Sequence, residues 1–131
     1  MRIHHLGIAV SSLEAALPVF EKLLGEPPIA QESVADQKVR VASFRLGESR
    51  VELLEGTSED SPITRFIAKR GQGIHHLTLT VPNLADALRN LEAQGFRLID
   101  REPRVGAGHE RIAFLHPTST AGVLIELIEE A

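Results

Sequence analysis

The 131-residue chain has no cysteine, no tryptophan and no tyrosine, and its longest apolar runs span only a few residues. The absence of cysteine excludes disulfides and thiolate metal ligands, and it fits the reducing conditions of the cytoplasm. Apolar runs this short exclude a membrane-spanning helix, which needs roughly 20 apolar residues. Because a strand pattern begins at the first residues, we also expect no secretory signal peptide. We therefore expect a cytoplasmic protein with no membrane partner.

Basic residues are also fewer than acidic ones. The chain has 14 lysines and arginines against 18 aspartates and glutamates, so its formal net charge is −4. Nucleic-acid-binding domains usually carry a basic stripe and aromatic side chains that stack on bases. Neither is present, since the only large aromatic side chains are five scattered phenylalanines. We expect no nucleic-acid partner. The length and the 43% hydrophobic fraction suit a single domain over residues 1–131.

The chain does contain an internal repeat. Residues 3–10 read Ile-His-His-Leu-Gly-Ile-Ala-Val and residues 74–81 read Ile-His-His-Leu-Thr-Leu-Thr-Val, at an offset of 71. Over residues 3–17, eight of the fifteen positions are identical in the second copy. The closing segments match as well, because Val-Glu-Leu-Leu-Glu at 51–55 corresponds to Ile-Glu-Leu-Ile-Glu at 125–129. Such self-similarity indicates a duplicated module.

Each copy has the pattern of a strand, a helix and three further strands. Ser11 and Ser12 in the first copy and Asn83 in the second precede leucines at helical spacing and are the expected helix caps. Short extended segments follow the helices at residues 29–34 and 97–101, ahead of two further strands in each copy. The pattern therefore predicts two tandem βαβββ modules.

The repeat also predicts the domain organisation. Module one covers residues 1–56, a linker helix covers 58–70, and module two covers 74–131. Pro62 falls in the first turn of the linker helix, where its missing N–H group leaves no hydrogen bond unmade. We expect an α+β fold in which the two modules form a curved eight-stranded mixed sheet around a metal-binding cleft.

Alternation along a strand places one histidine of each copy on the face that the helix does not cover. His5 shares this face with small residues, and His76 holds the same position in the second copy. Glu52 and Glu126 lie between apolar neighbours in the closing strands, where an unpaired carboxylate is expensive to bury. Two imidazoles and two carboxylates suit a divalent cation such as Co²⁺, Mn²⁺, Fe²⁺, Ni²⁺ or Zn²⁺. The predicted metal ligands are therefore His5, His76, Glu126 and Glu52.

Taken one at a time, these residues also allow other interpretations. A single histidine on an apolar strand is most often a hydrogen-bonded structural residue, and a single glutamate is most often solvated. Their placement at equivalent positions of a repeat favours the metal site. For His4 and His75, which share the helix-covered face, we expect a structural role. His109 and His116 are expected at strand ends, where contact with a substrate is the less favoured interpretation.

Several short motifs add a family resemblance. They are His-His-Leu-Gly-Ile-Ala-Val at 4–10, Ser-Pro-Ile at 61–63, Gly-Ile-His-His-Leu at 73–77, Phe-Leu-His-Pro at 114–117 and Gly-Val-Leu-Ile-Glu-Leu at 122–127. Together they make the chain resemble the vicinal oxygen chelate superfamily over essentially its whole length. Within that superfamily, the stretch His-Pro-x₄-Gly-Val-Leu-Ile-Glu is most typical of the methylmalonyl-CoA epimerases.

The resemblance implies an enzyme that epimerises methylmalonyl-CoA at C2 by removing and returning a proton through a metal-stabilised enolate. It implies metal binding by His5, His76 and Glu126, with Glu52 as a fourth ligand directly or through water. Glu126 and Glu52 are then the candidate catalytic acid–base residues, one from each module. Some relatives use another glutamate, in the strand that here covers residues 39–43 and has no carboxylate.

The resemblance also implies a cofactor and partners. Cobalt (Co²⁺) is the favoured ion, with Mn²⁺, Ni²⁺, Zn²⁺ and Fe²⁺ as alternatives. The expected partners are a small-molecule acyl-CoA substrate and a second copy of the chain in a homodimer.

Two other functions stay open. A glyoxalase-like lyase, or another vicinal oxygen chelate enzyme, would use the same ligands on a different substrate. A metal-free small-molecule binding module would need no ligands, and the full set of four ligand-type residues argues against it.

Overall fold

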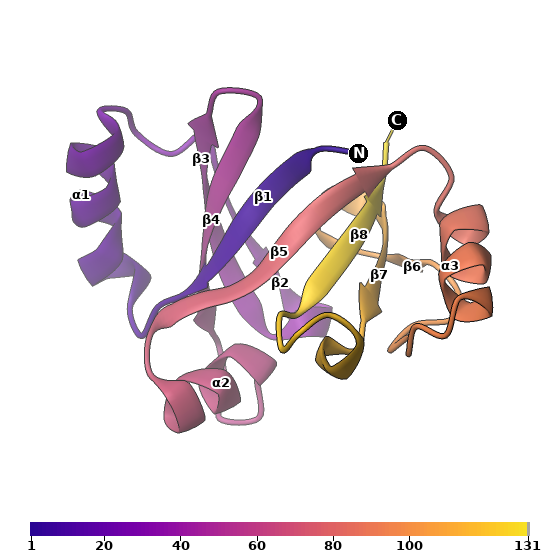
Figure 1. Ribbon diagram of the computed structural model, residues 1–131. Coiled ribbons are helices and arrows are strands. Elements are labelled where there is room, and N and C mark those ends of the chain that lie inside the picture. Colours follow the sequence, from indigo (N-terminus) through magenta and orange to yellow (C-terminus); the bar gives the residue numbers. More distant parts are fainter. Residues whose placement is uncertain (131) are drawn as a thin grey trace. The chain divides into compact units, whose positions relative to one another are not determined.

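The computed structural model describes residues 1–130, and Figure 1 shows their helices and strands. The first half of the chain has the predicted order of one strand, one helix and three strands, followed by a linking helix. Its elements are β1 (Ile3–Ala9), α1 (Leu13–Leu24), β2 (Ala30–Val34), the 3₁₀ helix η1 (Ala35–Gln37), β3 (Val39–Leu46), β4 (Ser49–Gly56) and α2 (Pro62–Arg70).

The second half repeats this order with shorter strands. Its elements are β5 (Gly73–Val81), α3 (Leu84–Ala93), β6 (Arg104–Val105), the 3₁₀ helix η2 (Ala107–His109), β7 (Arg111–Leu115), the 3₁₀ helix η3 (Pro117–Ser119) and β8 (Ile125–Glu129).

The strands pair in the same way in both halves. Their order is β2-β3-β4-β1 in the first half and β5-β8-β7-β6 in the second, and all eight belong to one mixed sheet. β1 runs parallel to β4, and β5 runs parallel to β8. The pairs β2–β3, β3–β4, β6–β7 and β7–β8 are antiparallel. The predicted α+β class, with two βαβββ modules and an eight-stranded mixed sheet, is confirmed.

Backbone packing groups the chain into two compact units, residues 5–75 and residues 1–4 together with those from His76 onward. The linking helix α2 belongs to the first of these units, because Ile63 is buried in a cluster with Ala9, Val41 and Leu54. Ser61 accepts a hydrogen bond from the backbone N–H of Ile63 and so caps this helix. The module limits of 1–56 and 74–131, with a linker at 58–70, remain a prediction.

In the first half, α1 packs on one face of β3 and β4. The side chain of Ser12 caps the helix by accepting a hydrogen bond from the N–H of Ala15, as the sequence predicts. The helix buries only Leu13 completely, in a cluster that includes Phe44 and Leu53. Val19 lies on its outer side and is exposed. α1 is therefore attached through a narrow apolar stripe.

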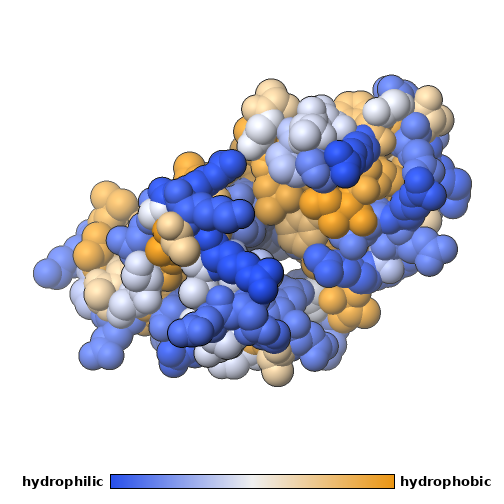
Figure 2. Space-filling model, turned by 90° about the horizontal axis from the view of Figure 1, so that it is seen from below, coloured by the Kyte–Doolittle hydropathy of each residue, from blue (hydrophilic) through white to orange (hydrophobic). Residues whose placement is uncertain are grey.

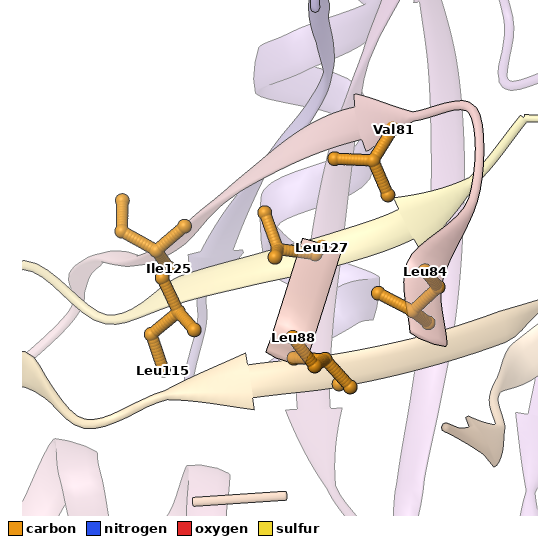
Figure 3. Packing of buried hydrophobic residues seen from close by; sticks show 7 residues of the cluster. Val81, Leu84, Leu88, Leu115, Ile125 and Leu127 are labelled. Carbon is orange, nitrogen blue, oxygen red and sulfur yellow. The ribbon is translucent and has the colours of Figure 1, made fainter. Parts of the chain in front are cut away.

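In the second half, α3 packs on β7 and β8, and Figure 3 shows the buried side chains between them. Asn83 caps α3 by accepting a hydrogen bond from the N–H of Asp86. Leu84 and Leu88 of the helix belong to one buried cluster with Leu115 and Leu127, and both are at most 1% exposed. The second helix is thus buried more deeply than the first.

Figure 2 shows one face of the molecule, which carries both hydrophilic side chains (blue) and hydrophobic ones (orange). Exposed large apolar side chains of the described residues include Leu23 of α1 and Val105 of β6. Single exposed apolar residues of this kind are ordinary on protein surfaces. None of the helices described by the structure is long and apolar enough to cross a bilayer.

Candidate active site

The first half of the chain brings together one histidine and one glutamate. His5 lies on β1 and Glu52 on β4, and the parallel register places Gly7 opposite Glu52. Since side chains two residues apart share a face, His5 and Glu52 project to the same side. His5 Nε2 is 3.3 Å from Glu52 Oε1, and the side chains are 8% and 16% exposed.

The second half brings together the equivalent pair. His76 lies on β5 and Glu126 on β8, and the parallel register places Thr78 opposite Glu126. His76 Nε2 is 3.4 Å from Glu126 Oε1, and the side chains are 8% and 9% exposed. The duplication seen in the sequence is therefore also a duplication of geometry, with one His–Glu pair, at most 16% exposed, on each parallel strand pair.

The surroundings of the two glutamates differ. Thr78 is fully buried, and its hydroxyl donates a 2.6 Å hydrogen bond to Glu126 Oε1. Phe114 of β7 lies opposite Glu126, and its ring meets the His76 imidazole edge-on at 6.0 Å between centroids. Glu126 is thus enclosed by larger side chains and held by a hydroxyl.

Small residues take the corresponding places around Glu52. Gly7 lies opposite Glu52 on β1, and Ser43 lies opposite it on β3. Glu52 has a greater exposed fraction than Glu126, 16% against 9%. The carboxylate in the first half therefore has smaller neighbours and is more exposed than the one in the second half.

Each pair fits a divalent metal ion by its chemistry and its spacing. Imidazole nitrogens and carboxylate oxygens are common ligands of the first-row divalent ions. The separations of 3.3 and 3.4 Å exceed those of a short charge-assisted hydrogen bond. They are the separation expected of two donors that each lie about 2.0–2.2 Å from one ion. The donors of each pair thus suit a divalent metal ion.

The other histidines have different surroundings. The His75 ring meets the Phe66 ring of α2 edge-on, with centroids 5.0 Å apart, which fits the structural role expected for it. His4 is only partly buried, whereas His5 is 6% exposed. His116 Nδ1 accepts a hydrogen bond from the backbone N–H of Thr118 and caps η3. His109 is exposed and has a positive φ of 67° in η2.

Thr78 and Phe114 are site residues that sequence reasoning missed. A signal for Thr78 was present, because it lies two residues after His76, on the same face of the same strand. The first copy has Gly7 at this place, so the difference between the copies pointed to it. Phe114 could not be found without the register between β7 and β8.

Comparisons with known proteins agree with the fold. Residues 4–114 match the family described as "Glyoxalase/Bleomycin resistance protein/Dioxygenase superfamily". The uncharacterized protein YqjC of Bacillus subtilis is 44% identical over 128 residues, covering 98% of this chain and 91% of that protein. The ethylmalonyl-CoA/methylmalonyl-CoA epimerase of Cereibacter sphaeroides is 36% identical over 128 residues, covering 96% of each.

A solved structure shares the whole fold. A variant of Streptomyces coelicolor methylmalonyl-CoA epimerase in complex with 2-nitronate-propionyl-CoA superposes with a TM-score of 0.94. It is 34% identical to this chain, and the match covers all of this chain and 95% of that one.

Proposed function

Because the chain belongs to the glyoxalase, bleomycin resistance protein and dioxygenase superfamily, we propose from this premise that it epimerises methylmalonyl-CoA at C2 with the help of a divalent metal. The observation that carries the proposal is the duplicated His–Glu pair, at most 16% exposed, on β1–β4 and β5–β8. Support for the substrate comes from relatives that are epimerases of acyl-CoA thioesters and that span nearly the whole chain.

The proposed ligands are His5, His76 and Glu126, with Glu52 bound directly or through water. The first three offer two imidazole nitrogens and one carboxylate oxygen, and all three side chains are buried. We favour Co²⁺ as the ion, with Mn²⁺, Ni²⁺, Zn²⁺ and Fe²⁺ as alternatives. When bound, such an ion would act as a Lewis acid that stabilises negative charge developing on the substrate oxygens.

Proton transfer is assigned to the two glutamates. The C2 hydrogen of methylmalonyl-CoA lies between a thioester carbonyl and a carboxylate, and it is only weakly acidic. Inversion requires a proton to leave one face of C2 and another to arrive on the opposite face. Glu52 and Glu126 come from equivalent places of the two halves, so they are the natural pair for the two faces.

The two glutamates are not interchangeable in this scheme. Glu126 accepts a 2.6 Å hydrogen bond from the Thr78 hydroxyl and is enclosed by its neighbours, which suits a ligand that keeps its position. Glu52 lies opposite Gly7 and Ser43, which suits a carboxylate that moves to carry a proton. A positioned acid–base group of this kind accelerates proton transfer by about 10²–10⁴-fold.

Proton NMR in D₂O with methylmalonyl-CoA tests the reaction and the substrate together. We expect deuterium to enter C2 while the two epimers interconvert, and the rate to fall when a chelator removes the metal. An enzyme that leaves the C2 proton of methylmalonyl-CoA in place contradicts the proposal.

The superfamily match also includes glyoxalases, so a second substrate belongs in the same experiment. The glutathione hemithioacetal of methylglyoxal should give no product with this protein. Turnover of that compound in place of methylmalonyl-CoA would assign a glyoxalase-like lyase. Elemental analysis of the purified protein separates both enzymes from a metal-free binding module.

We also propose that the protein is a homodimer in the cytoplasm. The absence of cysteine supports a reducing compartment. Light scattering at twice the monomer mass of 14.3 kDa is the expected result, and scattering at the monomer mass contradicts it.

A further inference from the structure

We propose that Thr78 is a positioning residue that fixes the carboxylate of Glu126 for metal binding; the inference rests on the proposed ligand role of Glu126. Thr78 is 0% exposed, in the interior of β5, and lies directly opposite Glu126 in the parallel pairing with β8. Its hydroxyl donates to Glu126 Oε1 at 2.6 Å.

This hydrogen bond selects one oxygen of the carboxylate. Glu126 Oε1 accepts from Thr78, and the same atom lies 3.4 Å from His76 Nε2. Rotation of the carboxylate would move Oε1 away from the imidazole and break a charge-assisted hydrogen bond. Because a β-branched side chain is stiff at χ1, Thr78 holds its hydroxyl in a fixed direction. The hydroxyl therefore keeps Oε1 facing the His76 nitrogen.

A role in strand pairing alone does not explain this residue. The first half forms the same parallel pair between β1 and β4 with Gly7 opposite Glu52. A glycine is therefore sufficient for the pairing, and the hydroxyl in the second half is an addition to it. Outer partners of this kind orient metal-binding side chains, and losing one lowers metal affinity or activity by about 10–100-fold.

The chain offers a matched control on the same strand. Thr80 lies two residues after Thr78, so it shares the same face, and it is 2% exposed. Its hydroxyl accepts a hydrogen bond from the backbone N–H of Arg2 at 3.1 Å. A Thr80→Val substitution therefore also removes a buried threonine hydroxyl from β5. This hydroxyl contacts the backbone of Arg2, so its loss tests the effect of changed packing alone.

The test is titration of the metal-free full chain with Co²⁺ in competition with a chelating indicator. We expect Thr78→Val to weaken Co²⁺ binding by about 10–100-fold, while Thr80→Val leaves it unchanged. Thr78→Ser keeps the hydroxyl and should restore most of the affinity. The visible absorption bands of bound Co²⁺ report its coordination geometry, so they should change in Thr78→Val and not in Thr80→Val. If Thr78→Val does not fold, Thr78→Ala, which leaves space for a water molecule, takes its place.

The outcomes separate this inference from the function on which it rests. Wild-type protein that binds Co²⁺, with Thr78→Val showing the same affinity and spectrum, overturns the role of Thr78 alone. Equal losses in Thr78→Val and Thr80→Val also overturn it, because the effect would then be a general loss of packing in β5. Wild-type protein that binds no divalent ion overturns the proposed metal site and the role of Thr78 together.

Discussion

The two halves of the chain present the same pair of residues in different surroundings. His5–Glu52 and His76–Glu126 have nearly equal separations of 3.3 and 3.4 Å, and each lies on a parallel pair of strands. Glycine lies opposite the first glutamate and threonine lies opposite the second. The duplicated pairs thus have different neighbours, and this difference is the basis of the different tasks proposed for the two carboxylates.

The helices that cover the other face of the two halves also differ, because α3 is buried more deeply than α1. Leu88 of α3 is 1% exposed, whereas Leu17, its counterpart at an offset of 71 in α1, is only partly buried. The deeper core therefore lies behind Glu126, the glutamate that we assign as the fixed ligand. Closely packed side chains resist displacement, so this core helps to keep the strand that carries Glu126 in place. The second half is thus the better scaffold for a rigid ligand.

Substitution of Glu126 should have the largest effect on catalysis. Glu126→Gln keeps the shape and an amide oxygen, but it removes the negative charge and cannot accept a proton at neutral pH. We expect kcat/KM to fall by about 10⁴-fold, or about 5.5 kcal/mol, with a loss of bound metal. Steady-state kinetics and elemental analysis measure the two effects. The control is Glu130→Gln, which alters an exposed carboxylate paired with Arg2; near-normal turnover in Glu126→Gln contradicts the assignment.

The difference between the two helices can be measured as stability. Leu88→Ala should lower the free energy of unfolding by about 3 kcal/mol, because it leaves a cavity in a closed core. Leu17→Ala should lower it by about 1 kcal/mol, because its site is partly open to solvent. Urea unfolding followed by circular dichroism measures both values. Equal losses would show that the two helices are equally well buried in solution.

Substitution of Glu52 should have a smaller effect on catalysis than substitution of Glu126. We expect Glu52→Gln to lower the rate of inversion by about 10²-fold, or about 2.7 kcal/mol, because one face of C2 loses its acid–base group. Glu126 still serves the other face, so deuterium from D₂O should enter C2 faster than the epimers interconvert. Proton NMR measures exchange, and a coupled assay measures inversion.

Two other results for Glu52→Gln would change the comparison. Complete loss of exchange, with metal and substrate still bound, would make Glu52 the indispensable base. Near-normal turnover in both glutamine variants would show that neither carboxylate is the base, and His116 would be the next residue to test.

The sequence was sufficient to predict the paired strands and the faces of the histidines. The period of two along a strand places His5 and His76 on one side, and a register error of one residue would have moved them to the face that the helices cover. It was not sufficient for the segment at 97–101, which was expected to be extended. There Leu98 forms only an isolated bridge to Leu115, and the paired strand β6 comes later, at Arg104–Val105.

The reason for this difference is a side chain that replaces a backbone partner. The N–H of Phe114 donates to the carboxylate of Asp100 at 2.8 Å, and so the ladder beside β7 is interrupted at that point. The hydrogen bond from Thr78 to Glu126 escaped prediction for a related reason. Both contacts depend on the register between strands that are distant in the sequence, and local patterns do not determine that register.

The smallest effect is expected from a substitution in the loop between β2 and β3, which corresponds to the loop between β6 and β7 in the second half. Lys38 closes η1 with a positive φ of 54°, and its ammonium group pairs with the exposed carboxylate of Asp60. Hydrogen bonds from Lys38 and then Ser58 lower the pKa of Asp60 from 3.8 to about 2. The corresponding loop of the second half has no such pair among its described residues, and turns instead at Gly108, with φ 72°.

Lys38→Met should therefore raise the pKa of Asp60 toward 3.8 and leave catalysis unchanged. Because the folded-state pKa lies below the ordinary value, the pair stabilises the fold above about pH 3.8, and this contribution disappears as the pH falls toward 2. The difference in stability between wild type and variant should shrink over that range, and added salt should shrink it at neutral pH. Carboxyl ¹³C NMR measures the pKa of Asp60 directly. The control is Arg89→Met, which removes the exposed pair between Arg89 and Asp86 in α3 and should leave the pKa of Asp60 unchanged. An Asp60 pKa that Lys38→Met does not move would contradict the assignment of the lowered pKa to the Lys38–Asp60 pair.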